Sequence, residues 1–168
     1  MNSDVPTGTL LRTLAASKPG GSFLELGTGC GLGTSWILDG MDRNSSLTSV
    51  DTDPTPQAIA REELEADTRL RLVLEDGLTF LARAQQPYDL IYADAWPGKF
   101  DGLDMALALV KRGGFYVVDD MLPQPNWPMD HAPKAAALIE RLLALDGFES
   151  TWLEWSTGLI ICVKSLTN

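Results

Sequence analysis

The chain has 168 residues, of which 45% are hydrophobic and 21% are charged. These values are typical of a soluble globular protein and exclude a disordered chain, so we expect one domain over residues 1–168. The net charge at pH 7 is −10 because 23 acidic side chains outnumber 13 basic ones. Since this charge repels polyphosphates and the sequence has no basic patch, we expect no nucleic-acid partner.

The cysteines and the first residues indicate the compartment. Cys30 and Cys162 lie far apart and form no CxxC pair, which favours free thiols in a reducing cytoplasm over a disulfide or a zinc site. The first four residues lack the basic start of a signal peptide, and no apolar run is long enough to span a membrane. We therefore expect a cytoplasmic protein without a membrane partner.

Helix-like and strand-like segments alternate along the chain, which is typical of an α/β fold with a parallel sheet. The predicted helices are 9–17, 34–41, 54–66, 78–84, 101–110 and 130–145. The predicted strands are 22–26, 47–51, 70–74, 88–93, 115–118, 149–155 and 159–164. Only three residues join the last two strands, too few for a parallel crossover, so we expect five parallel strands followed by an antiparallel hairpin.

A glycine-rich loop follows the first predicted strand, with Gly27, Gly29 and Gly31 in a GxGxG spacing. Residues without Cβ atoms let the backbone turn with positive φ and let a ligand lie against it, although a purely structural turn is the alternative. A dinucleotide fingerprint needs a further glycine where Leu32 or Thr34 stands, which disfavours an NAD-dependent oxidoreductase.

Acidic residues stand at the carboxyl ends of all five predicted parallel strands. Ligands of open α/β sheets bind outside these ends, so we expect the acids to line the site. A carboxylate after the second strand can accept two ribose hydroxyls, and one near the glycine loop suits a positively charged ligand. The alternative for Asp53 and Asp76 is that they cap the helices that follow. The acids are Glu25, Asp51, Asp53, Glu75, Asp76, Asp94, Asp119 and Asp120.

Glu25, the glycine loop and Asp51 together resemble class I S-adenosylmethionine-dependent methyltransferases. The segments 88–96 and 111–122 resemble the fourth and fifth strands of O-methyltransferases of the catechol and caffeoyl-coenzyme A type. The resemblance implies a Rossmann-like sheet of order 3-2-1-4-5-7-6, S-adenosylmethionine as cofactor, and methyl transfer to a hydroxyl of a small molecule. The expected cofactor-binding residues are Glu25, Gly27, Thr28, Gly29, Gly31, Asp51, Thr52, Glu75, Asp76, Gly77, Asp94, Ala95 and Trp96.

The same resemblance implies a Mg²⁺ site made of Asp94, Asp119 and Asp120. Carboxylate oxygens are the ligands that Mg²⁺ prefers. The family carries asparagine at the position of Asp120, and the extra negative charge leaves three alternatives open: tighter, altered or abolished metal binding. An acidic site disfavours an anionic acceptor unless a metal intervenes.

Three residues are candidates for catalysis: Asp94, Lys99 and His131. The catechol-type lysine comes three residues after the fourth-strand acid, where this chain has Pro97, and Lys99 follows two residues later. Lys99 reaches inward if the Pro-Gly turn redirects it; otherwise it is a solvated surface lysine. His131 is the single histidine and is either a general base or a solvated residue at a helix start.

The segment 121–131 has three prolines that prevent regular structure. Its Trp127 and Met129 offer apolar surface for an acceptor, so we expect a lid or wall, with a plain surface connection as the alternative. Trp96 is expected beside the cofactor adenine, or else in the core. A non-catalytic S-adenosylmethionine-binding module is the second functional hypothesis, and both a monomer and a homodimer remain open.

Overall fold

The computed structural model describes residues 4–124, 127–128 and 130–166. Its seven strands form one sheet of order β3-β2-β1-β4-β5-β7-β6, which confirms the predicted order. The pairings among β1 to β5 are parallel, whereas β7 pairs antiparallel with β5 and β6. The strands are β1 Ser22–Leu26, β2 Ser46–Asp51, β3 Leu70–Leu74, β4 Tyr88–Ala93, β5 Val110–Val118, β6 Phe148–Leu153 and β7 Leu159–Lys164.

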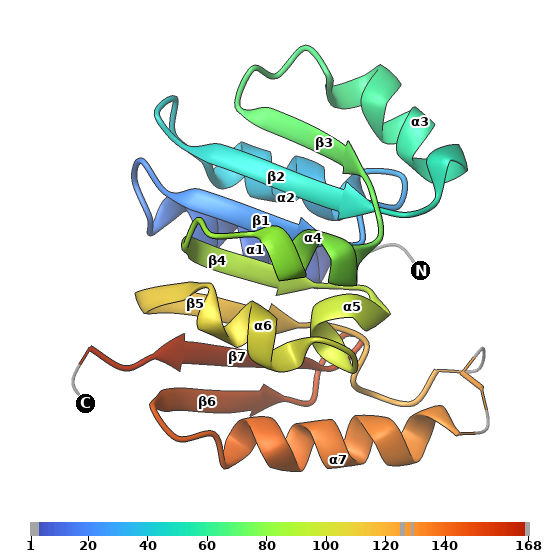
Figure 1. Cartoon of the computed structure of the whole chain (residues 1–168), viewed down its shortest axis with the longest axis vertical. Coiled ribbons are helices and arrows are strands. Elements are labelled where there is room, and N and C mark those ends of the chain that lie inside the picture. Colours follow the sequence, from blue (N-terminus) through green and yellow to red (C-terminus); the bar gives the residue numbers. More distant parts are fainter. Residues whose placement is uncertain (1–3, 125–126, 129, 167–168) are drawn as a thin grey trace.

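Helices cover both faces of the sheet. In Figure 1, α1 and α2 lie behind the sheet and α4 and α6 lie in front of it. Each face has its own apolar core, because the side chains of successive strand residues point to opposite faces. The helices are α1 Val5–Ala16, α2 Leu32–Gly40, α3 Pro54–Leu64, α4 Gly77–Arg83, α5 Trp96–Lys99, α6 Leu103–Ala108 and α7 His131–Leu143.

Several elements differ from their predicted bounds by one or two residues, and three differences are larger. Helix α1 begins at Val5 rather than at residue 9, because the Asp4 carboxylate accepts a hydrogen bond from the Thr7 backbone and caps the helix. Strand β5 begins at Val110, inside the predicted helix 101–110, and its register against β4 shifts between Tyr88 and Leu90. The short helix α5 was not predicted, and it shapes the site described below.

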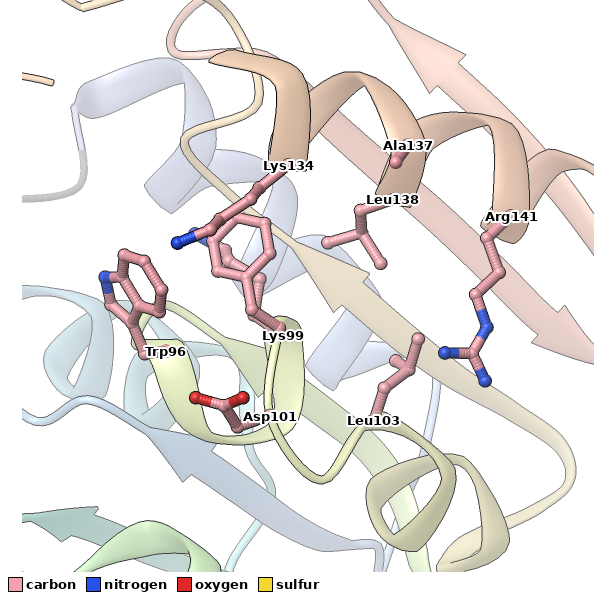
Figure 2. A pocket seen from close by; sticks show the side chains of 9 residues that line it. Trp96, Lys99, Asp101, Leu103, Lys134, Ala137, Leu138 and Arg141 are labelled. Atoms are coloured by element: carbon pink, nitrogen blue, oxygen red, sulfur yellow. The ribbon is translucent and has the colours of Figure 1, made fainter. Parts of the chain in front are cut away.

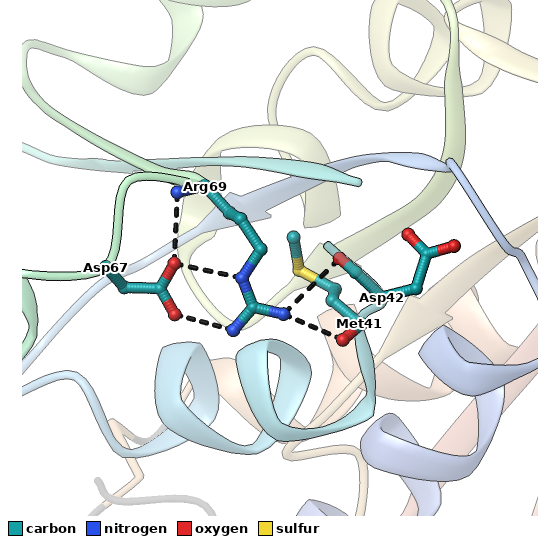
Figure 3. Close-up of polar contacts among 4 residues, drawn as sticks. All are labelled: Met41, Asp42, Asp67 and Arg69. Atoms are coloured by element: carbon teal, nitrogen blue, oxygen red, sulfur yellow. Dashed lines mark hydrogen bonds and ion pairs between the residues drawn. The ribbon is translucent and has the colours of Figure 1, made fainter. Parts of the chain in front are cut away.

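Arg69, which directly precedes β3, connects two loops at the amino-terminal ends of the strands. Its guanidinium binds both carboxylate oxygens of Asp67, at 2.9 and 2.6 Å, and donates to the carbonyl oxygen of Met41 at 2.7 Å (Figure 3). A bidentate pair of this kind fixes geometry as well as charge. It holds the loop after α2 against β3, at the end of the strands opposite the candidate site. None of the described helices has the length and apolar composition to cross a bilayer.

Candidate cofactor and acceptor site

The glycine loop joins β1 to α2 and has positive φ at Gly27 (105°), Gly29 (51°) and Gly31 (88°). A Cβ atom on Gly27 would lie 3.1 Å from the backbone of Asp94, and one on Gly31 would lie 2.8 Å from the Cβ of Ala60. The loop is therefore clamped between the end of β4 and helix α3. Glycine is required there for close packing as well as for backbone conformation.

We expect Gly31→Ala to lower the free energy of unfolding by about 2–4 kcal/mol, since it adds a clash with Ala60 to an unfavourable φ. Gly29→Ala is the matched control, because a Cβ there meets nothing within 4 Å and only the backbone cost of about 1–2 kcal/mol remains. Urea unfolding of both variants measures the difference. Equal losses would contradict the packing of the loop against α3.

Asp51 at the end of β2 holds the glycine loop directly. Its Oδ2 accepts a hydrogen bond from the Gly29 backbone at 2.8 Å, and its Oδ1 accepts one from the Asp53 backbone at 2.9 Å. A carboxylate has about four acceptor positions, so two remain for ligand hydroxyls. A cavity of ≈ 60 Å³ opens beside it. Its lining residues are Leu26, Gly27, Val50, Asp51, Thr52, Asp76, Gly77, Ala95 and Pro97.

Two of the predicted cofactor residues with polar side chains are buried against the protein rather than exposed in this cavity. Glu25 is 1% exposed, and its Oε2 accepts hydrogen bonds from the hydroxyls of Ser49, at 2.5 Å, and Thr34. Thr28 is also buried and its hydroxyl lies 2.7 Å from that of Ser49. The Glu25 carboxylate therefore faces the side chains of Ser49 and Thr34 and not the cavity where a charged ligand was expected to meet it. In this structure it supports the segments around the glycine loop.

The acids after β3 also have structural partners. Glu75 pairs with Arg83 at 2.5 Å and is absent from the cavity lining. Asp76 lines the cavity and caps α4, accepting a hydrogen bond from the Thr79 backbone at 2.9 Å. Asp53 caps α3 through the Thr55 backbone at 2.9 Å. The capping interpretation is therefore confirmed for Asp53 and Asp76.

Burial raises the pKa of Glu25 to about 7, and the hydrogen bonds from Ser49 and Thr34 oppose this rise. Because the folded-state pKa lies above the ordinary value of 4.5, the folded chain holds this proton more tightly than the unfolded chain. Its contribution to stability is complete below about pH 4.5 and is lost as the pH rises through about 7.

As the pH rises through the pKa of Glu25, the wild type is expected to lose free energy of unfolding on the order of 3 kcal/mol, and Glu25→Gln is expected to remove this pH dependence. Urea unfolding at several pH values between 4.5 and 8 checks this, with the difference between variant and wild type taken at each pH. Other titrating groups cancel in that difference. A difference that does not change with pH would contradict a buried, proton-binding Glu25.

A second cavity of ≈ 180 Å³ lies beside the first and contains all three predicted catalytic residues. Lys99 is only 4% exposed, so the surface interpretation of this lysine is wrong. The reason is the short helix α5, in which Pro97 and Gly98 leave helical geometry and turn the chain inward. The lining residues are Asp94, Ala95, Trp96, Lys99, Phe100, Asp120, Trp127, Pro128 and His131.

His131 is the first residue of α7 and is 7% exposed, so it is not a solvated helix start. Its ring packs against Trp127, Phe100 and Trp96, with centroids 4.3, 5.1 and 5.6 Å apart. Neither ring nitrogen has a hydrogen-bond partner among the residues that the structure describes. Burial, aided by the charge of Lys99, lowers the pKa of His131 and so favours the neutral imidazole, which can accept a proton.

Two residues of the predicted lid or wall segment lie in this cavity. Trp127 and Pro128 line it, whereas Met129 lies outside the described residues, and a role of the segment toward an acceptor stays a prediction. Trp96 is 40% exposed, so it is not a core residue. Phe100 was missed by the sequence analysis, although its place directly after Lys99 in an aromatic-rich segment was a usable signal.

The charged groups in the cavity influence each other, with Lys99 buried and Asp94 and Asp120 half-buried. Burial, and then the charge of Asp119, raises the pKa of Asp94 well above its usual value. Burial also raises the pKa of Asp120, against the opposing effect of Lys99. The pKa of Lys99 is lowered by burial, while the carboxylates of Asp94 and Asp120 counteract that change.

The structure does not form the predicted Mg²⁺ site. Asp94 and Asp120 reach the cavity, but Asp119 is 2% exposed and does not line it. Both oxygens of Asp119 accept hydrogen bonds: Oδ2 from the Tyr92 hydroxyl at 2.7 Å, and Oδ1 from the Thr157 hydroxyl and the Asp120 backbone. Within the described part of the chain, no group of three or more His, Cys, Asp or Glu side chains is placed to hold a metal ion. The residues present therefore do not fit the implied metal.

A groove of ≈ 350 Å³ shares Trp96, Lys99 and Phe100 with the second cavity and runs between α6 and α7. Figure 2 shows Lys134 and Arg141 reaching into it from α7. The Nζ of Lys134 lies 4.7 Å from the Trp96 ring centroid. Neither residue was predicted from the sequence, although their spacing of seven places them on one helix face.

Comparisons with known proteins identify the family. Residues 24–121 match the sequence model of a family described as "Methyltransferase domain". A Mycobacteroides abscessus protein named "Putative O-methyltransferase" is 33% identical over 94% of this chain, which covers 78% of that protein. A Mycolicibacterium smegmatis protein with a similar name is 38% identical over 66% of this chain, which covers 56% of that protein.

Solved structures share the fold. A protein of Corynebacterium glutamicum superimposes with a TM-score of 0.87 at 26% identity, covering all of this chain and 84% of that one. An O-methyltransferase from Bacillus cereus, determined in complex with SAH, gives a TM-score of 0.82 at 21% identity, over 98% of this chain and 83% of that one. This chain therefore belongs to the class I S-adenosylmethionine-dependent methyltransferase family, in which the relatives it matches carry O-methyltransferase names.

Proposed function

We propose that this protein transfers a methyl group from S-adenosylmethionine to a hydroxyl of a small molecule. One observation carries the proposal: the cavity at the glycine loop and the cavity with the catalytic candidates share Ala95, just after β4. A nucleoside held at Asp51 in the first cavity is then adjacent to an acceptor held in the second. Such placement of two reactants accounts for much of the rate of a displacement reaction.

The residues of the second cavity suit the acceptor side of this reaction. Bound S-adenosylmethionine supplies an electrophilic methyl group on a sulfonium. The neutral imidazole of His131 is able to take the hydroxyl proton, and Trp96, Phe100 and Trp127 provide flat apolar surface for an aromatic acceptor. The buried ammonium of Lys99 stabilises negative charge on the acceptor oxygen.

The groove between α6 and α7, lined by Lys134 and Arg141, indicates which kinds of acceptor molecule fit the site. Lys134 and Arg141 pair with Asp130 at 2.7 Å and with Asp104 at 2.5 Å, so their charges are already partly compensated. The groove therefore favours a neutral or weakly anionic extension of the acceptor over a polyphosphate. The cytoplasmic location, the single domain, the lack of a nucleic-acid partner and the choice between monomer and homodimer stay predictions.

Two measurements test the proposal. Calorimetry with S-adenosylhomocysteine is expected to show saturable binding, and a screen of catechols, flavonoids and hydroxylated amines is expected to release S-adenosylhomocysteine from S-adenosylmethionine. Binding without turnover on any acceptor would favour the non-catalytic module. Binding of NADH, followed by fluorescence, would favour the oxidoreductase.

We expect His131→Phe to lower kcat by about 10²-fold, because the ring packing is kept while the proton acceptor is lost. The affinity for S-adenosylhomocysteine should stay unchanged, since His131 does not line the first cavity. Steady-state kinetics and calorimetry on the same preparation measure both. An unchanged kcat would exclude His131 as the base.

A further inference from the structure

The acceptor cavity contains a buried cation that comes from the chain itself. Lys99 is 4% exposed, and among the described residues its Nζ has no hydrogen-bond or ion-pair partner; the Phe100 ring centroid lies 5.9 Å from it. A lysine ammonium is strongly hydrated, so burial without a direct partner is costly. A buried ammonium directed at a ligand cavity is therefore a candidate for contact with a ligand.

Two carboxylates, those of Asp94 and Asp120, line the cavity together with this ammonium. The charge of the more deeply buried Asp119 also acts on Lys99. The three carboxylates come from the carboxyl ends of β4 and β5, whereas Lys99 comes from α5. Asp120 has a φ of 58°, a left-handed conformation that aspartate tolerates better than most residues. The chain therefore encloses the ammonium within a negative field.

A divalent cation at the same place would lack the third expected ligand and would meet a like charge. Asp119 is 2% exposed, does not line the cavity, and already accepts hydrogen bonds from Tyr92, Thr157 and the Asp120 backbone. Mg²⁺ can bind through two carboxylates with waters completing its coordination, so the charge of Lys99 decides whether Asp94 and Asp120 hold an ion. The Lys99 ammonium in the same cavity repels any ion bound between them.

We propose that Lys99 occupies the place of a divalent cation, so that this chain activates its acceptor without a metal ion. The ammonium compensates part of the charge of Asp94 and Asp120 and donates a hydrogen bond to the acceptor oxygen. The role of Lys99 toward the acceptor rests on the proposed function, whereas the exclusion of metal does not.

The transfer step balances without a metal. The acceptor oxygen forms a bond to the methyl carbon while the carbon–sulfur bond breaks, and the electron pair of that bond returns to sulfur. The hydroxyl proton passes to His131. Lys99 keeps its protons throughout and stabilises the oxygen while its negative charge develops.

Binding of Mn²⁺ tests the exclusion of metal without any acceptor. Electron paramagnetic resonance of free Mn²⁺ is measured with the protein saturated by S-adenosylhomocysteine, for the wild type, Lys99→Gln and the double variant Lys99→Gln/Asp94→Asn. The wild type is expected to bind no Mn²⁺ in the submillimolar range. Lys99→Gln is expected to gain a site at least about tenfold tighter, which the double variant loses again. Lys134→Gln, at an exposed lysine that also contacts Trp96, is the matched control and should behave as the wild type.

Two results of this titration would overturn the inference. One is saturable Mn²⁺ binding by the wild type that Asp94→Asn removes. The other is a folded Lys99→Gln variant that gains no site, because Lys99 would then not be what excludes the metal.

A turnover assay on the wild type tests the inference even if Lys99→Gln does not fold. With any acceptor found in the screen, EDTA and added MgCl₂ are expected to change the rate by less than about twofold. A loss of at least about tenfold in EDTA that Mg²⁺ restores would overturn the inference and leave the methyltransferase assignment intact. Absence of both S-adenosylhomocysteine binding and turnover, with or without Mg²⁺, would instead contradict the proposed function.

Discussion

Replacement of Asp119 with alanine is expected to lower the free energy of unfolding by about 3–5 kcal/mol. The carboxylate is 2% exposed and accepts hydrogen bonds from Tyr92, Thr157 and the Asp120 backbone. Its removal takes this acceptor away from three donors at a buried position, which costs far more than the loss of a surface charge. Urea unfolding at pH 7 measures the loss.

Two single-donor variants are the controls for this prediction. Tyr92→Phe and Thr157→Val each remove one hydroxyl and leave the carboxylate with its other donors, so each is expected to cost about 1–2 kcal/mol. A stable Asp119→Ala variant that loses only activity would contradict the structural role. That result would instead support the role of Asp119 as a metal ligand, which the family resemblance implied.

Asp51→Ala is expected to weaken S-adenosylhomocysteine binding by about 10²-fold or more. The carboxylate holds the Gly29 backbone at 2.8 Å and the Asp53 backbone at 2.9 Å, and it lines the cavity proposed for the ribose. Its loss therefore loosens the loop and removes the acceptor of the ligand hydroxyls at once. Calorimetric titration measures the change in affinity.

The matched control for Asp51 is Asp53→Ala, two residues later. Asp53 is exposed and caps α3 through the Thr55 backbone, and it does not line the cavity. Its replacement should affect stability slightly and leave the affinity within about twofold. Equal losses of affinity in the two variants would show that general damage to this segment, rather than the Asp51 contacts, reduces binding.

The sequence predicted the sheet well because its signals are local. The apolar run of β4 and the short turn before β7 are readable without tertiary contacts, and the structure confirms the strand and the antiparallel hairpin. The turn has five residues, 154–158, rather than the predicted three, because β6 ends at Leu153. The spacing of Gly27, Gly29 and Gly31 predicted positive φ, which all three adopt. The strand order came from the family resemblance, since the chain alone does not specify which parallel strands are neighbours.

The parts that the sequence did not predict depend on contacts between distant segments. Lys99 looked like a surface lysine because nothing local shows that Gly98 packs against Leu26, where a Cβ would lie 2.3 Å from a side-chain atom. The burial of Glu25 depends on Ser49 from β2 and Thr34 from α2. The partners of Asp119 include Thr157, 38 residues away. The role of a carboxylate at a strand end therefore depends on its partners, and the residue type alone leaves it open.

A crystal structure of the protein with S-adenosylhomocysteine tests the central claim most directly. We expect the ribose hydroxyls to lie within hydrogen-bond distance of Asp51 and the homocysteine part of the ligand to lie along Gly27 to Gly31. The sulfur is expected beside Ala95, where it faces the cavity lined by Lys99 and His131. A ligand bound elsewhere, or one whose sulfur faces away from that cavity, would contradict it.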